Sequence, residues 1–163
     1  MSLLDILYGT IKTCPFKRII FLSDGEEIVE EKVFTIKINP GVPSGSRFRI
    51  SSKGNKYPNR IPADIVYTTV DKQDLMFIRK GTDIIYTAQV TKEQIKKQNK
   101  IEIPNLEGMI LIRKVPSSLS SSYKILNRGL PFPDNSKKRG KLIVKFELTA
   151  SKNTSNHSLL CIN

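Results

Sequence analysis

The chain has 163 residues and carries 27 Lys plus Arg against 15 Asp plus Glu, a net charge of +12 at pH 7. Its hydrophobic content of 39% and charged content of 26% are ordinary for a soluble protein, and no apolar run approaches the ~20 residues that span a bilayer. We therefore expect no membrane segment and one or two globular domains. The positive charge favours anionic partners without naming one.

The residue types that carry catalysis and metal binding are scarce. The two cysteines, Cys14 and Cys161, lie at opposite ends of the chain, and His157 is the only histidine. This pattern excludes a zinc site built on paired cysteines and a disulfide framework, so we expect no metal and no cofactor. Without a phosphate-binding glycine loop or a histidine beside a nucleophile, we expect no enzyme. The N-terminus has no basic leader or cleavage site, which predicts a cytoplasmic location.

The first 31 residues predict a short helical turn and a strand. Large apolar residues flank Asp5 and predict an amphipathic turn that Gly9 ends. Thr10 to Ile20 is predicted to be a strand in which Pro15 marks an edge or a bulge. The acidic run from Glu26 to Glu31 is interpreted as a solvated approach to the next strand.

The stretch from Lys32 to Tyr67 organises the chain. Phe34, Ile36 and Ile38 recur with period two and predict one buried strand face. After two turn signals, Arg47 to Ile50 alternates again, and we expect it to pair with the preceding strand as a hairpin. Ala63 to Val70, rich in β-branched residues, predicts a third and more deeply buried strand.

The second half repeats the first. Ile84 to Val90 predicts a strand, and Thr91 with Gln94 fits a capping box before a short lysine-rich helix or turn. Four blocks recur at offsets of 76, 75, 75 and 77 positions; they pair Ile36 and Pro40 with Ile112 and Pro116, Phe48 and Ile50 with Tyr123 and Ile125, Gly54 with Gly129, and Ile65-Val66-Tyr67 with Leu142-Ile143-Val144. We predict an all-β fold of two tandem β-sandwich-like domains with short helical turns, at residues 1–82 and 83–150, followed by a polar tail at 151–163.

The order of these landmarks resembles the C-terminal substrate-binding region of the DnaJ family, co-chaperones of heat-shock protein 70. The likeness covers roughly residues 3 to 150 and is carried by Pro40-Gly41, by Pro62-Ala63-Asp64-Ile65-Val66, by Phe77-x-Arg79-x-Gly81-x-Asp83-Ile84-Ile85-Tyr86 and by Gly129-Leu130-Pro131. Because no Cys-x-x-Cys repeat is present, the chain resembles the zinc-free, type II subclass. The resemblance implies a co-chaperone fragment that binds unfolded or extended polypeptides and the acidic C-terminal tail of heat-shock protein 70.

The same resemblance implies where binding occurs. It assigns Cys14, Phe16 and Phe77 to a shallow peptide-binding groove, and Lys12 and Lys32 to contacts with the acidic tail. An edge strand offers backbone pairing, apolar pockets accept alternate side chains, and lysines attract carboxylates. For Phe16 and Phe77 an ordinary core position is an equal alternative, and for Lys12 alone a solvated surface lysine is the simpler interpretation.

Two other functions are compatible with the sequence. A basic nucleic-acid-binding module would need aromatic residues among basic ones on an exposed strand face; Arg47-Phe48-Arg49 is the nearest candidate, although the repeat makes Phe48 a core position. The other candidate function is that of an assembly or scaffold protein that has kept the fold without client binding. We expect a monomer or a weak homodimer, since the tail has too few aliphatic residues for a stable interface.

Overall fold

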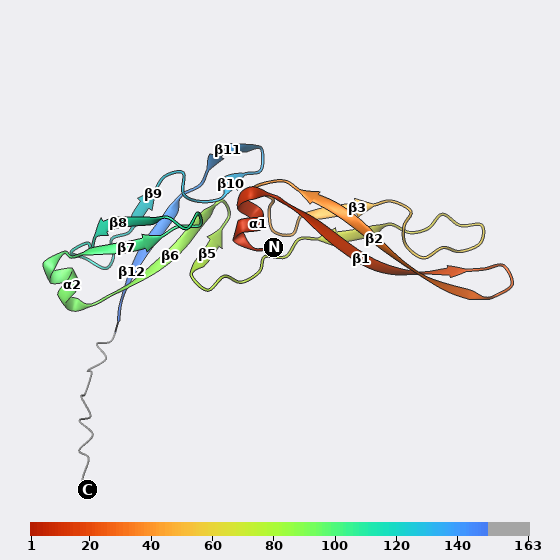
Figure 1. Cartoon of the computed structure of the whole chain (residues 1–163), viewed down its shortest axis with the longest axis horizontal. Coiled ribbons are helices and arrows are strands. Elements are labelled where there is room, and N and C mark those ends of the chain that lie inside the picture. The colour runs from red at the N-terminus through yellow and green to blue at the C-terminus, as the bar shows by residue number, and fades with distance from the viewer. Residues whose placement is uncertain (150–163) are drawn as a thin grey trace, which may run out of the picture.

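The computed structural model describes residues 1–149, and the fold is all-β with two short helices, as predicted. The predicted polar tail at residues 151–163 lies outside the described residues. The molecule is elongated, with the early strands at one end, the late strands at the other and the first helix between them (Figure 1). The elements are α1 Leu3–Tyr8, β1 Thr10–Phe21, β2 Glu27–Ile38, β3 Arg47–Ile50, β4 Ile65–Thr68, β5 Phe77–Lys80, β6 Asp83–Val90, α2 Lys92–Lys97, β7 Lys100–Pro104, β8 Ile110–Lys114, β9 Tyr123–Ile125, β10 Pro131–Phe132, β11 Asn135–Arg139 and β12 Leu142–Leu148.

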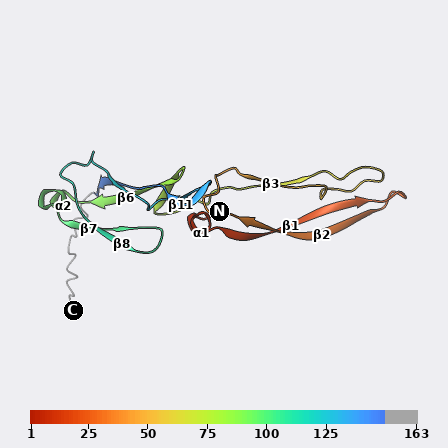
Figure 2. The same cartoon turned by 90° about the horizontal axis from the view of Figure 1, so that it is seen from above.

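Strands β1 to β4, here called the first unit, form two antiparallel pairs. β1 pairs with β2 over its whole length, and β3 pairs with β4. The pairs lie in two layers (Figure 2). The expected hairpin between the strand of Phe34 and Arg47–Ile50 is therefore wrong. The loop from Pro40 to Gly45 carries the chain from one layer to the other instead of reversing it within one sheet, while the tight turn at Asp24-Gly25 is what makes β2 the partner of β1.

The acidic run belongs to strand β2 and does not precede it. Glu30 pairs with Arg18, and Glu31 with Lys17, both directly across the β1–β2 ladder. Opposite charges at facing positions stabilise an antiparallel pair. The basic side chains of β1 therefore balance the negative charges of these glutamates. This explains how a strand can form from an acidic sequence that, by itself, suggests a solvent-exposed segment before the strand.

Strands β5 to β12 with α2, here called the second unit, contain a sheet in the order β5-β6-β12-β9 and two hairpins, β7–β8 and β10–β11. β7 and β8 form an antiparallel hairpin, as β1 and β2 do. β9 pairs with β12 in the same antiparallel way as β3 pairs with β4. The internal repeat found in the sequence is thus a repeat of strand pairing. β6 adds a parallel partner to β12.

Helix α1 ties the two units together. Ser2 caps it through the amide of Asp5, in a reciprocal capping box. Its buried residues Leu3, Ile6 and Leu7 belong to one hydrophobic cluster with Phe77 and other second-unit side chains. The boundary predicted between residues 82 and 83 falls in the turn that joins β5 to β6, whose strands pair as a hairpin.

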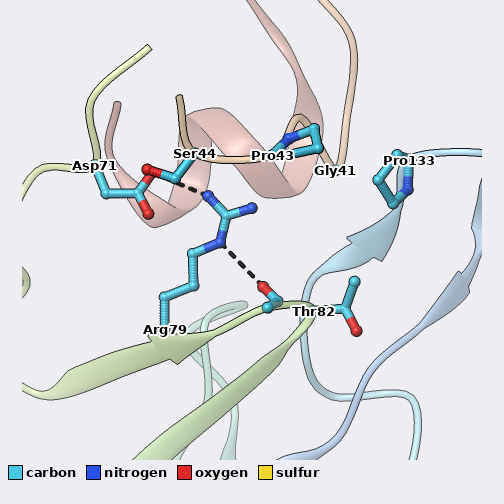
Figure 3. Close-up of a pocket in the computed structure, with 8 residues that line it drawn as sticks. Gly41, Pro43, Ser44, Asp71, Arg79, Thr82 and Pro133 are labelled. Carbon is cyan, nitrogen blue, oxygen red and sulfur yellow. Dashed lines mark hydrogen bonds and ion pairs between the residues drawn. The ribbon is translucent and has the colours of Figure 1, made fainter. Parts of the chain in front are cut away.

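Arg79 lies at the junction of the units (Figure 3). Its guanidinium donates to Asp71 at 2.9 Å, to the carbonyl of Val42 at 2.8 Å and to the carbonyl of Gly81 at 3.0 Å. Nearby, Gly41 has φ +77°, and a Cβ there would lie 2.5 Å from the carbonyl oxygen of Pro131. Only glycine allows the backbones of the two units to approach this closely.

Neither described helix has the length and apolar character that crossing a membrane requires.

Candidate functional site

Strand β1 presents an unpaired edge over its first half. The backbone groups of Ile19 and Phe21 point away from β2 and bond to Asn55 and Lys56, which cover the far end of this edge. By the alternation of an antiparallel ladder, Ile11, Thr13 and Lys17 point the same way, and no backbone hydrogen bond is made on that side of them within residues 1–149. A short segment of β1 is therefore available for pairing.

Pro15 sits on this free side. Its ring nitrogen points away from β2, where the missing N–H removes no ladder bond. This is why proline is tolerated in a strand of twelve residues. Because the β1–β2 register is continuous through Pro15, the prediction of an edge strand is confirmed and no bulge is present. The missing N–H of Pro15 leaves one gap in the row of backbone donors that an added strand would meet.

The inner face of the β1–β2 pair looks across at β3–β4 and encloses a cavity of about 320 Å³. Lys12 and Cys14 line it from β1, and Tyr67 lines it from β4. Tyr67 donates its hydroxyl to the carbonyl of Cys14 at 3.4 Å, and burial raises the pKa of that phenol. The remaining lining is largely aliphatic and aromatic, from Ile36, Ile38, Phe48 and Val70. The site therefore combines an apolar hollow with a strand edge.

Four of the five predicted site residues share this inner face. Lys12, Cys14 and Phe16 alternate on β1, and Lys32 is directly opposite Phe16 on β2. Phe16 is half-buried and stacks on Phe34 with ring centroids 4.7 Å apart. The strand period of two brings these residues together, as the sequence pattern predicted.

Phe77 lies elsewhere. It is 5% exposed, belongs to β5 of the second unit and packs on Tyr86, with ring centroids 5.8 Å apart. It borders a different hollow, beside Leu3. The structure thus does not bring Phe77 to the cavity that Cys14 lines.

Both predicted tail-binding lysines have carboxylate partners within the chain. Lys12 is 2.9 Å from Asp5 at the first turn of α1, and this contact, together with the amide of Ser2, lowers the pKa of Asp5 to about 2. Lys32 is 2.9 Å from Glu30, which also pairs with Arg18, and the two cations lower the pKa of Glu30. An acidic ligand must therefore compete with these internal acids.

Sequence reasoning missed the opposite wall of the cavity. Phe48 on β3, Tyr67 on β4 and Thr69 directly after β4 line the cavity together with Cys14. The alternation of Tyr67 and Thr69 can be read from the sequence. Which layer these side chains face is decided by the pairing of β3 with β4. Among the described residues, no group of three His, Cys, Asp or Glu side chains is placed to hold a metal ion.

The fold and the site define a class of protein: two related β-units in tandem, with a free strand edge beside an apolar hollow. Comparison with known proteins agrees with this. The family model of the DnaJ C terminal domain matches residues 1–150. DnaJ protein homolog 1 of Drosophila melanogaster is 32% identical over 151 residues, covering 91% of this chain and 45% of that protein. DnaJ homolog subfamily B member 5 of Homo sapiens is 29% identical, over 91% of this chain and 43% of that protein. Chaperone protein DnaJ of Roseiflexus is 30% identical over 130 residues, covering 78% of this chain and 35% of that protein.

The chain belongs to the DnaJ C terminal domain family. The resemblance to the C-terminal region of a type II DnaJ protein is therefore confirmed. The chain spans less than half the length of these curated relatives.

Proposed function

We propose that this chain is the polypeptide-binding part of a co-chaperone, and that it acts by binding and not by catalysis. One observation carries the proposal: the unpaired β1 edge at Ile11 to Lys17 runs beside a cavity whose lining is largely apolar. An extended client can add a strand to this edge through main-chain bonds and place alternate side chains against Cys14 and Phe16. The membership in the DnaJ C terminal domain family supports this role.

The groove is small, so binding is weak. Pro15 interrupts the donors of the edge, and the hollow is about 320 Å³. Small buried apolar area leaves little surplus over the cost of ordering a flexible peptide. We expect dissociation constants of roughly micromolar or weaker for extended apolar peptides.

The Phe16→Asp variant tests the groove. A charge on the inner face of β1 should abolish binding of an extended apolar peptide, measured by fluorescence anisotropy. Val33→Asp is the matched control, because Val33 is on the outer face of the same hairpin and is 59% exposed. Equal loss in both variants, or binding that survives Phe16→Asp in a folded protein, would contradict the proposal.

Phe77 is not used for this test, because a charge at a position 5% exposed threatens the core. We propose that Phe77 supports the groove through the cluster that it shares with Leu3.

We further propose that Lys12, and Lys32 beside Phe16, contact the acidic C-terminal tail of heat-shock protein 70. Asp5 competes for Lys12 from 2.9 Å. Replacing Asp5 with Asn should therefore strengthen binding of a Glu- and Asp-rich peptide, while Lys12→Ala should weaken it, both measured by calorimetry at low and high salt. Unchanged affinity in Lys12→Ala would remove Lys12 from the site.

The nucleic-acid alternative has lost its main support. Phe48 lines the cavity and is half-buried, so it does not offer an exposed face for base stacking. Failure of all peptide binding with an intact fold would instead favour the scaffold alternative. The cytoplasmic location and the monomeric or weakly dimeric state stay predictions.

A further inference from the structure

The far end of the second unit carries a cluster of exposed basic side chains, here called the basic end. Its members come from helix α2 and from the β7–β8 hairpin that follows, and they are Lys92, Lys96, Lys97, Lys100, Arg113 and Lys114. Figures 1 and 2 both place α2 at the end of the elongated molecule farthest from the first unit. The basic end is therefore remote from the β1 edge.

The order of the elements gathers these side chains. α2 ends at Lys97, β7 begins at Lys100, and Lys114 at the end of β8 lies directly opposite Lys100 in the ladder. Ile95 packs against the hydrophobic cluster of the second unit, which holds α2 in place and leaves its lysines in solvent. The helix and one end of the hairpin thus form one basic surface.

The charge of the basic end is not balanced by neighbouring acids. None of its six cations forms an ion pair within residues 1–149. Of the acids between positions 92 and 114, Glu107 is already paired with two arginines, which leaves Glu93 and Glu102. Like charges that face each other, as Lys100 and Lys114 do, destabilise an antiparallel pair. The fold gains nothing from this arrangement, whereas an anionic partner would.

Exposed isoleucines lie beside the lysines. The alternation of β8 puts Ile110, Ile112 and Lys114 on its outer face, and the two isoleucines are 58% and 57% exposed. Leu111 points the other way and packs against the hydrophobic cluster. The outer face of the hairpin is therefore aliphatic along β8 and basic at the end next to α2, with Glu102 as its one acid.

This combination of side chains distinguishes between anionic partners. Single-stranded nucleic acid binds by stacking on aromatic rings, and no Phe, Tyr or Trp lies between positions 92 and 114. A second copy of this face would bring like charges together. An acidic lipid surface suits both kinds of side chain, because its headgroups attract the lysines and its interface accepts the isoleucines.

We propose that the basic end is a peripheral docking site for an acidic lipid surface. The lysines of α2 and of the hairpin contact the headgroups, and Ile110 and Ile112 enter the interface. Each lysine close to such a surface contributes roughly fivefold in affinity, and salt screens this attraction. The site goes beyond the proposed function because it lies on the second unit, binds lipid and leaves the β1 edge free for a polypeptide.

Vesicles test the contact. We expect the 163-residue chain to sediment at low salt with phosphatidylcholine vesicles that contain about one third phosphatidylserine, to be released at high salt, and not to bind phosphatidylcholine alone. The chain has no tryptophan, so Ile112→Trp introduces a single fluorescent reporter whose emission should shift to the blue on binding. Val29→Trp is the matched control, because Val29 is 62% exposed on the first unit. Absence of sedimentation, or the same shift in both variants, would overturn the proposal.

Charge variants locate the binding surface. Lys114→Glu places an acid opposite Lys100, so it should preserve or raise the thermal midpoint while weakening vesicle binding by roughly twentyfold or more. Lys53→Glu makes the same change in net charge at an exposed position of the first unit and should have little effect. Glu102→Gln should strengthen binding.

Two outcomes of these measurements contradict the site. Equal losses in Lys114→Glu and Lys53→Glu would mean that vesicle binding follows net charge alone. Displacement of the vesicles by a Glu-rich peptide or by single-stranded RNA, with tighter binding of that competitor to the parent than to Lys114→Glu, would assign the basic end to a polypeptide or a nucleic acid.

Discussion

At the residue scale, the ion cluster on Glu107 shows how charge is used in the second unit. Glu107 pairs with Arg139 and, at 2.5 Å, with Arg128, and both cations lower the pKa of its carboxyl. The side chain of Glu107 is 22% exposed, so the pairs are partly shielded from water. Arg139 also donates to the carbonyl of Gly129 at 2.9 Å, which ties β11 to the loop after β9.

We expect Glu107→Gln to lower the free energy of unfolding by about 1 kcal/mol at neutral pH, in line with partly exposed ion pairs. Because the folded-state pKa is depressed, this contribution is present above the pKa of an unfolded glutamate, about 4.3, and is lost as pH falls through the folded value. Urea titrations from pH 7 to pH 3 check this. Glu102→Gln is the control, since Glu102 forms no ion pair in the described part of the chain. A difference between the variants that did not shrink as the pH fell would contradict the assignment.

At the element scale, β1 is a long strand that contains a proline, Pro15. Pro15 faces Val33 across the ladder without weakening it, because its nitrogen is on the free side. The strand pairs along twelve positions with β2, and only a short segment of its other edge is unpaired within residues 1–149. Proline on an edge strand limits unwanted pairing between sheets.

Replacing Pro15 with Thr should therefore restore one donor to the free edge and strengthen binding of extended peptides by roughly threefold to tenfold, the range expected for one main-chain hydrogen bond. The thermal midpoint should change little, since no bond to β2 is involved. Peptide titration and a melting curve on the same sample check both expectations. A large loss of stability would show that Pro15 has a structural role that the ladder register does not reveal.

At the scale of the whole molecule, α1 makes the two units depend on each other. Ile6 is fully buried in the cluster that includes Phe77 and Leu130, and its carbonyl accepts from the amide of Gly41 at 2.8 Å. The first unit has few fully buried residues of its own: outside α1, only Ile38 among its large apolar side chains is less than 9% exposed. Its stability must therefore come in part from α1 and the second unit.

We expect Ile6→Ala to destabilise the whole chain by about 2 to 4 kcal/mol, the usual cost of a buried cavity. Methyl signals of Ile36 in the first unit and Val144 in the second should disappear at the same urea concentration in both variant and parent. Leu4→Ala, on the exposed side of the same helix at 51% exposure, is the control. Separate transitions for the two methyl groups would mean that the units fold independently.

The sequence alone determined the local elements and their repetition. The period of two around Phe34 and Ile36, the capping box at Thr91 and the offsets of 75 to 77 residues depend on neighbours in the chain, so they are readable without coordinates. The same period placed Lys12, Cys14 and Phe16 on one face. The family resemblance, which is a pattern of such local features, was readable for the same reason.

Only the tertiary structure decided which strands pair and which side chains share a hollow. Apolar alternation is equally compatible with pairing of β2 to β3 or to β1, because it states which face is buried and not which strand lies alongside. An aromatic side chain such as Phe77 suits a groove and a core equally well, and the long-range packing of β5 against α1 placed it in the core, in one cluster with Leu3. The unpaired edge of β1 was likewise decided by tertiary structure, since an unpaired backbone group is a property of what lies next to it in space and not of its own residue type.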